Sequence, residues 1–313
     1  MKHVFVLSME NKDLAKEEIK SLTNKKEKKI FNRFLFIDTK QIDYTRLAFT
    51  KKVLQQIFIC KFSELEDKIK KTNFQKYYEK DFCIRTFGEK QLEEKYLADL
   101  IWPKFKKPKV NLSTPKTLFN FYFIKNKVIC GKVLHDTNNQ FRERTLRKRP
   151  VAYSGTFSAK IAKVLVNLSK VKPKETLWDP FCGTGAILIE AKLMKTQIIG
   201  SDIEDRMLDA AKTNLKYFKL KAKIKKQDAT TAKEKFNVIV TDLPYGRKTK
   251  LTKEKTQLYN DFLNNVYKQT KKGKRVVIVM PNNVNIKSKF KTVKTIRHYA
   301  HKTLTRKIIV LEK

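Results

Sequence analysis

Residues 178–186 read WDPFCGTGA and lie between a short apolar strand and a helix. Gly183 and Gly185 would let the backbone turn tightly and approach a ligand with no Cβ in the way. The spacing differs from the dinucleotide pattern G-x-G-x-x-G, and no Lys followed by Ser or Thr marks a phosphate-binding loop. The stretch therefore predicts a loop that holds a ligand without phosphates at the carboxyl end of a strand.

On either side of this loop, strands alternate with helices, as judged from the spacing of apolar residues. The expected strands are Thr176–Trp178, Ile198–Ser201, Lys223–Lys226, Val238–Thr241 and Arg275–Met280; the expected helices are Ala159–Leu168, Ala186–Met194, Glu204–Phe218 and one near Leu258–Thr270; and a final hairpin spans Lys294–His301 and Leu304–Leu311. Alternating units of this kind predict a Rossmann-like α/β fold, with a doubly wound parallel sheet and a C-terminal antiparallel hairpin. Ligands of such sheets bind outside the carboxyl ends of the strands.

Two acidic residues follow the expected strands. Asp202 lies seventeen residues after Gly185, where a carboxylate commonly accepts ribose hydroxyls. Asp228 follows the next strand and could accept a hydrogen bond from an adenine amine. Taken singly, each could instead cap a turn or a helix. A nicotinamide enzyme is the alternative for the whole set, but its fingerprint is missing.

Residues 241–246, TDLPYG, end the fourth strand on the same rim as the glycine loop. An exocyclic amine of a base is a poor nucleophile because its lone pair is delocalised into the ring. The Asp242 carboxylate and the backbone carbonyl of Leu243 could each accept one amine hydrogen, and Asp242 could take the departing proton. Pro244 fixes φ in the turn, and Tyr245 offers a face on which the base stacks. The alternative is a proline turn with a capping Asp.

The first half of the chain has a different pattern, that of an α+β unit with mostly antiparallel pairing. We expect strands at His3–Leu7, Ile30–Ile37, Val53–Phe62 and Asp81–Phe87, helices at Asn11–Leu22, Tyr44–Thr50, Glu64–Thr72 and Glu89–Trp102, and a hairpin of Thr117–Ile124 with Val128–Leu134. Between the halves, residues 136–158 are polar and hold Arg142, Arg144, Arg147 and Arg149. These arginines suit either a solvated linker or a linker that also binds phosphate.

The charge of the chain indicates a polyanionic partner. Lys and Arg number 71 against 31 Asp and Glu, a formal net charge of +40 over 313 residues. Nucleic acid is the first interpretation, because Lys and Arg neutralise its phosphates. An anionic membrane is the rival, yet no apolar run approaches the roughly 18–20 residues of a membrane span. Four widely spaced cysteines and the lack of a cleavable signal predict reduced thiols in a cytoplasmic protein with no metal site.

The two motifs, in this order and spacing, resemble the amino-methyltransferases, whose signature tetrapeptide is Asp/Asn/Ser-Pro-Pro-Tyr/Phe/Trp. The wider chain is similar to the archaeal tRNA guanine-N2 methyltransferases that carry a THUMP domain. Residues 149–155, RPVAYSG, resemble the segment that leads into their catalytic domain, and residues 301–308, HKTLTRKI, resemble its terminal hairpin. The resemblance is strong in the second half of the chain and only topological in the first.

The resemblance implies an S-adenosylmethionine-dependent enzyme acting on tRNA, here expected as a monomer without an evident partner subunit. Its domains would be an N-terminal ferredoxin-like unit (1–57), a THUMP RNA-binding domain (58–135), a basic linker (136–158) and a methyltransferase domain (159–313). It also implies that the cofactor contacts are Asp179, Phe181, Gly183, Thr184, Gly185, Asp202, Ile203, Asp228 and Ala229.

An Asp at the head of the tetrapeptide, followed by Tyr245, Gly246 and Arg247, is typical of enzymes that act on guanosine 10 of tRNA, whereas relatives acting on guanosine 6 tend to carry Asn. Arg247 joins the expected RNA contacts. Leu243 in place of the first Pro and VAYS at 151–154 depart from the family pattern, which leaves monomethylation and dimethylation both open. The rivals are an rRNA or DNA amino-methyltransferase and a non-catalytic tRNA-binding module.

Overall fold

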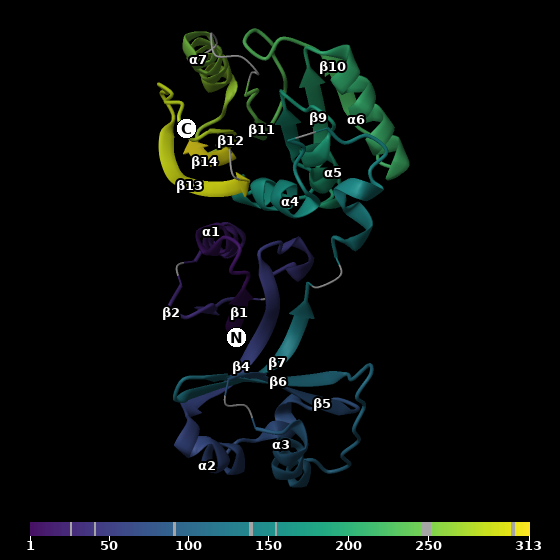
Figure 1. Ribbon diagram of the computed structural model, residues 1–313, viewed down its shortest axis with the longest axis vertical. Helices are drawn as coiled ribbons and strands as arrows, with labels where there is room; N and C mark the ends of the chain where they lie inside the picture. Colours follow the sequence, from purple (N-terminus) through teal and green to yellow (C-terminus); the bar gives the residue numbers. More distant parts are fainter. Residues whose placement is uncertain are drawn as a thin grey trace. The chain divides into compact units, whose positions relative to one another are not determined.

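The protein is described by a computed structural model that covers residues 1–25, 27–40, 42–89, 92–137, 140–153, 155–245, 252–301 and 304–313. The chain forms two compact units (Figure 1). The first unit comprises Met1–Met9, Lys25–Tyr44 and Thr50–Thr137; the second comprises Glu10–Asn24, Thr45–Phe49 and Asn138–Lys313. The chain therefore contributes a helix and a short segment from its first 50 residues to the second unit.

The first unit is built on a seven-stranded sheet of order β2-β3-β1-β4-β7-β6-β5. The strands are β1 Lys2–Leu7, β2 Lys29–Phe31, β3 Phe34–Asp38, β4 Thr50–Lys61, β5 Phe82–Gly88, β6 Thr117–Ile124 and β7 Lys127–Asp136. Neighbours are antiparallel except β5 and β6, which are parallel. The mostly antiparallel pairing and the β6–β7 hairpin that the sequence predicts are confirmed.

A cluster of aromatic residues fills the core beneath β4, β5 and β6. Phe58, Phe82, Phe119 and Phe121 pack with apolar residues of helices α2 (Leu65–Lys70) and α3 (Glu94–Ile101). Two sequence predictions in this half are wrong. The single strand expected at 30–37 is two strands, because the chain reverses at Asn32 with φ at 53°. The helix expected at 44–50 is one 3₁₀ turn, Tyr44–Arg46, after which β4 begins.

The second unit holds another seven-stranded sheet, of order β10-β9-β8-β11-β12-β14-β13. The strands are β8 Thr176–Asp179, β9 Gln197–Asp202, β10 Lys223–Lys226, β11 Val238–Asp242, β12 Arg275–Pro281, β13 Lys291–His301 and β14 Leu304–Glu312. The helices are α1 Lys12–Thr23, α4 Ala159–Leu168, α5 Ala186–Leu193, α6 Asp205–Tyr217 and α7 Thr252–Gln269. Five strands are parallel and the terminal hairpin is antiparallel, as the sequence predicts.

The order of the parallel strands reverses between β8 and β11. From β8 the chain adds β9 and then β10 on one side, and it returns to the other side of β8 with β11 and β12. Ligands of doubly wound sheets bind at such a switch point, in the crevice beyond the carboxyl ends of the two strands. Asp179 ends β8 and Asp242 ends β11, so both expected motifs lie at this crevice.

Helix α1 is fixed to the second unit through a buried carboxylate. Glu18 accepts hydrogen bonds from the backbone N–H of Ala48 (2.9 Å) and of Phe49 (2.8 Å), and from Asn167 Nδ2 (2.8 Å) on α4. The side chain is fully buried, and burial raises its pKa to about 7. These bonds satisfy donors that would otherwise be buried without partners. Among the described helices, none is long and apolar enough to cross a membrane.

Replacing Glu18 with Ala should destabilise the second unit strongly. The change leaves the N–H groups of Ala48 and Phe49 buried without acceptors, and each unsatisfied group costs about 1–3 kcal/mol. We expect the free energy of unfolding, measured by urea titration at pH 7, to fall by about 2–4 kcal/mol. Lys20→Ala on the exposed side of the same helix should change it by less than about 0.5 kcal/mol. Equal effects of the two changes would contradict the role assigned to Glu18.

Candidate active site

The glycine loop joins β8 to α5 and is held on both sides. Cys182 N donates to Ser201 O at 2.9 Å on the neighbouring strand, and Gly185 N donates to Cys182 O at 2.8 Å. Gly183 and Gly185 have φ of 50° and 82°, in the left-handed region that favours glycine. The two glycines therefore let the chain pass from strand to helix in six residues, with backbone facing the crevice.

Asp202, at the end of β9, reaches back to this loop. Its Oδ2 accepts from Gly183 N at 2.9 Å and its Oδ1 accepts from Glu204 N at 3.2 Å. Burial raises the pKa of the carboxyl, while hydrogen bonds from the backbone N–H groups of Gly183, Glu204 and Ile203 oppose the shift. Ile203 beside it is exposed. A half-buried carboxylate and an apolar side chain thus follow the loop where a nucleoside would be held.

The other expected cofactor residues fall into different environments. Asp228 is exposed, and its Oδ1 accepts from the N–H (2.8 Å) and the hydroxyl (2.7 Å) of Thr230, which is the geometry of a turn-capping Asp. Ala229 is buried, and its carbonyl accepts from Asn265 Nδ2 at 3.0 Å. Phe181 packs edge-on against Phe262 of α7, with ring centroids 5.3 Å apart. For Asp228 the capping alternative is present, and a ligand contact stays a prediction.

Asp179 lies behind the loop and ties the two central strands together. It is 1% exposed, and its Oδ1 accepts from Thr241 Oγ1 at 2.7 Å on β11. Burial raises its pKa to about 8, with smaller contributions from the nearby Asp202 and Asp242 charges. The residue therefore connects the glycine loop to the tetrapeptide from inside the sheet.

The tetrapeptide turns away from β11 with its backbone fixed. Leu243 N donates to Val279 O at 2.9 Å, and the Leu243 side chain is buried in the core that also contains Tyr259 and Phe262 of α7. The Tyr259 hydroxyl donates to Pro244 O at 2.7 Å. A leucine in place of the usual first proline thus gains a buried apolar contact, which holds the turn.

Asp242 and Tyr245 form a hydrogen-bonded pair at the mouth of the site. The Tyr245 hydroxyl donates to Asp242 Oδ1 at 2.6 Å. Burial raises the pKa of Asp242 to about 7, and the nearby Arg306 charge and the Tyr245 hydroxyl act in the opposite direction. The carboxylate is therefore close to its titration point at neutral pH, which suits a group that must accept a proton.

Three residues at this site are not predicted from the sequence. Arg306 of β14 lies with its guanidinium 5.5 Å from the Tyr245 ring centroid. Asn214 of α6 is fully buried and donates to the carbonyls of Val151 (2.8 Å) and Thr184 (2.9 Å). Thr241 binds Asp179, as described above. Arg306 lies in the segment 301–308, which resembles the family's terminal hairpin, but a strand pattern does not reveal which side chain faces a neighbouring loop.

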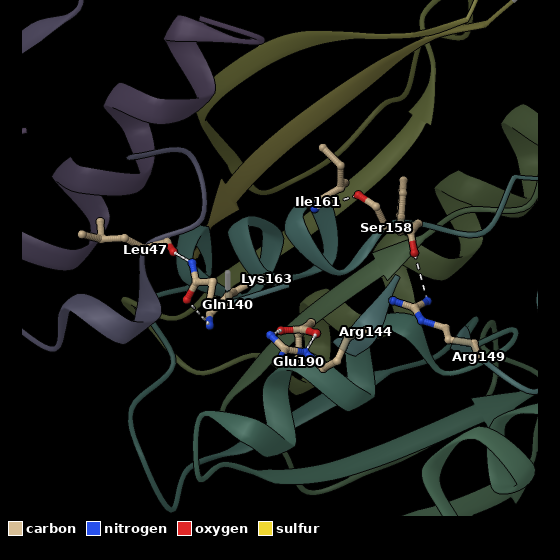
Figure 2. A network of polar contacts seen from close by, with 9 residues as sticks. Leu47, Gln140, Arg144, Arg149, Ser158, Ile161, Lys163 and Glu190 are labelled. Atoms are coloured by element: carbon tan, nitrogen blue, oxygen red, sulfur yellow. Dashed lines mark hydrogen bonds and ion pairs between the residues drawn. The ribbon is translucent and has the colours of Figure 1, made fainter. Parts of the chain in front are cut away.

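The linker arginines divide into two kinds (Figure 2). Arg144 pairs with the buried Glu190 carboxylate of α5, with Nε 2.7 Å from Oε1 and Nη2 3.3 Å from Oε2. Arg149 is buried and donates to Phe157 O at 3.0 Å. Arg142 and Arg147 are exposed. Of the five expected RNA contacts, Arg144 and Arg149 are thus engaged within the protein, because Arg also satisfies buried acceptors, and Arg247 lies outside the described residues.

Together, the sheet order, the glycine loop and an acid-headed tetrapeptide at the switch point define a methyltransferase. A family model described as an RMKL-like methyltransferase domain matches residues 147–308, and a model described as a DNA methylase matches residues 4–213. The tRNA (guanine(10)-N2)-dimethyltransferase of Methanothermobacter thermautotrophicus is 31% identical over 283 residues, which cover 86% of this chain and 84% of that protein. The chain belongs to this tRNA (guanine(10)-N2)-dimethyltransferase family.

Further relatives carry the names of tRNA guanine-N2 methyltransferases. The Pyrococcus abyssi protein of the same name is 33% identical over 215 residues, covering 65% of this chain and 64% of that protein. The tRNA (guanine(6)-N2)-methyltransferase of Methanocaldococcus jannaschii is 28% identical over 215 residues, covering 55% and 56%. The crystal structure of TrmN from Thermus thermophilus matches the whole fold, with a TM-score of 0.56, 17% identity and all of both chains covered.

Replacing Tyr245 with Phe should raise the pKa of Asp242 further above its usual range. The change removes a hydroxyl that stabilises the ionised carboxylate by donating to it. The titration of Asp242, followed by ¹³C NMR of the carboxyl carbon, should move to higher pH. Tyr259→Phe is the matched control, because that hydroxyl donates to Pro244 O instead. An unmoved titration in Tyr245→Phe would contradict the assigned bond.

Proposed function

We propose that the protein transfers methyl groups from S-adenosylmethionine to the exocyclic N2 of a guanosine in tRNA, at position 10, and that it adds up to two. The observation that carries the proposal is Asp242 at the carboxyl end of β11, at the switch point beside the glycine loop. The names of the relatives supply the nucleoside and its position, and the Asp at the head of the tetrapeptide agrees with them.

The residues beyond β8 and β9 fit the methyl donor. Apart from Gly183 itself and its two chain neighbours, no described residue has an atom within 4 Å of where a Cβ on Gly183 would stand, so there is room for a ligand beside the loop. Asp202 would accept the ribose hydroxyls, the loop backbone of 183–185 would lie along the amino acid portion, and the exposed Ile203 would cover the adenine. When bound, the donor supplies a methyl group on a sulfonium, which is an electrophile.

Asp242 and the Leu243 carbonyl would act on the guanine amine. Asp242 Oδ1 holds the Tyr245 hydroxyl, which leaves Oδ2 to accept one amine hydrogen, and the carbonyl of Leu243 accepts the other. Accepting both hydrogens turns the nitrogen lone pair out of the ring and stabilises its developing positive charge. As the nitrogen gains its methyl group, Asp242 takes one proton, for which a pKa of about 7 is well suited.

The N-terminal half would bind the tRNA. We propose a ferredoxin-like unit at 1–57, of which Glu10–Asn24 and Thr45–Phe49 belong to the second compact unit, and a THUMP domain at 58–135. Support for the second comes from its aromatic core, in which every buried member falls between Phe58 and Cys130. The linker 136–158 would add phosphate contacts through Arg142 and Arg147, and residues 159–313 would form the catalytic domain. The base would leave its stack to reach Asp242, as other enzymes require for chemistry on a paired base.

Methyl transfer tests the proposal directly. Purified protein, labelled S-adenosylmethionine and unmodified tRNA should yield N2-methylated guanosine at position 10. Asp242→Ala removes the proton acceptor and should lower the rate by at least about 10²-fold, while tRNA affinity changes little. Label at position 6 would correct the site. Duplex DNA is included as a substrate because a DNA methylase model matches residues 4–213. Label in duplex DNA or in adenosine would overturn the proposed substrate. A lack of transfer to any nucleic acid would favour a non-catalytic binding module.

The salt dependence of tRNA binding tests the linker. Arg142→Ala with Arg147→Ala removes two exposed cations, and each lost phosphate contact should flatten the slope of log K against log salt by about 0.7–0.9. Arg144→Ala is the control, because this side chain binds Glu190; it should lower the melting temperature and leave the slope unchanged. An unchanged slope in the double variant would make the segment a plain linker.

A further inference from the structure

Arg306 is an unusually placed charge. It is 5% exposed, and its guanidinium carbon lies 4.5 Å from the ring centroid of Phe157 and 5.5 Å from that of Tyr245. Nη2 donates to Gly155 O at 3.0 Å. Its buried Nε has no hydrogen-bond partner among the described residues, and within that same part of the chain Arg306 forms no ion pair. The buried guanidinium is thus held by two rings and one carbonyl, with no ion pair among the described residues.

The two rings come from the segments that border the catalytic crevice. Phe157 belongs to the lead-in segment (149–157), which Asn214 and Arg149 also hold in place. Tyr245 ends the tetrapeptide. Arg306 contacts both from β14, where it is in register with Pro281 of β12. One side chain therefore connects the lead-in segment to the residue on which the base stacks.

We propose that Arg306 is a positioning residue for methyl transfer, which fixes the ring of Tyr245 and places a positive charge near Asp242. The ring is held at two points, by its hydroxyl on Asp242 and by the guanidinium near its face. The base can then stack only on the ring surface that Arg306 does not cover. This inference rests on the proposed function, because it concerns the same site.

Among the described charged and titratable groups around Asp242, Arg306 is the cation that acts on it. Asp179 of β8 is acidic, and the hydroxyls of Tyr245 and of Tyr259 on α7 are neutral at the working pH. Burial raises the pKa of Asp242, and among the described groups Arg306 contributes the charge that lowers it. His298 on β13 titrates near Arg306, and both burial and the Arg306 charge lower its pKa, so it is uncharged at neutral pH.

The test compares pH profiles of kcat/KM for wild type, Arg306→Met and Arg306→Lys. Without the cation, Asp242 holds its proton to higher pH, so the acid limb should move upward. Arg306→Met should then lose about tenfold of kcat/KM on the acid limb for each pH unit of displacement, and much less well above it. Arg306→Lys keeps the charge but loses the planar stack. Its acid limb should stay near that of the wild type, while KM for tRNA rises several-fold.

Arg275→Met is the matched control. Arg275 is equally buried and lies in the neighbouring strand β12, but at the opposite end from Asp242, where it binds Glu312 and Leu168 O. Its loss should lower the melting temperature and leave the acid limb in place. If Arg306→Met instead lost the same fraction of kcat/KM at every pH, with its acid limb in place as in Arg275→Met, the proposal would be overturned.

A second measurement separates this inference from the proposed function. The ¹³C NMR titration of Asp242 needs no turnover, and it should move to higher pH in Arg306→Met but little in Arg306→Lys. If Arg306→Met does not fold, Arg306→Gln takes its place. An unmoved Asp242 titration overturns the role of Arg306 whatever the activity. If the titration moves in a protein that methylates no tRNA, the effect of Arg306 on Asp242 stands and the proposed function is overturned.

Discussion

The divergence of β8 and β11 is the constraint on which the site depends. The two central strands pair over only two residue pairs, Val238 with Leu177 and Ile239 with Trp178. Beyond them no further described residues of the two strands pair, and the hydrogen bond from the Thr241 hydroxyl to the buried Asp179 carboxyl connects the strands. Because the chain reverses its winding at this point, a crevice lies beyond the carboxyl ends of the two strands. The ends of β8 and β11 thereby present the glycine loop and the tetrapeptide to the same crevice.

The sequence predicts those parts of the site whose chemistry lies in consecutive residues. The glycine loop and the Asp-Leu-Pro-Tyr turn are local patterns, and the alternation of strands and helices puts both on one rim. Arg306 and Asn214 could not be predicted, because their roles arise from contacts with residues 30 or more positions away in the chain. Their neighbours exist only once the sheet has formed.

The same distinction explains the wrong or incomplete predictions. A run such as residues 30–37 shows β-forming residues but not the left-handed Asn32 that splits it. The basic linker shows arginines but not the buried Glu190 carboxylate that engages Arg144, since a glutamate commonly faces solvent. Helix α1 is predicted as a helix, yet nothing in its pattern indicates that Glu18 fixes it to the catalytic unit.

The net charge of the chain and the carboxyl groups at the crevice suit two different parts of a nucleic acid, its phosphate backbone and a base. The chain as a whole is strongly basic, which favours encounter with the phosphate backbone of a nucleic acid. Three carboxyl groups lie at the crevice, those of Asp179, Asp202 and Asp242, and the charges of the last two contribute to the raised pKa of the first. An acidic crevice repels phosphate but stabilises a sulfonium and an amine that is gaining positive charge. In the proposed function, the basic chain would hold the phosphate backbone of the substrate, and a base extruded from its stack would enter the site.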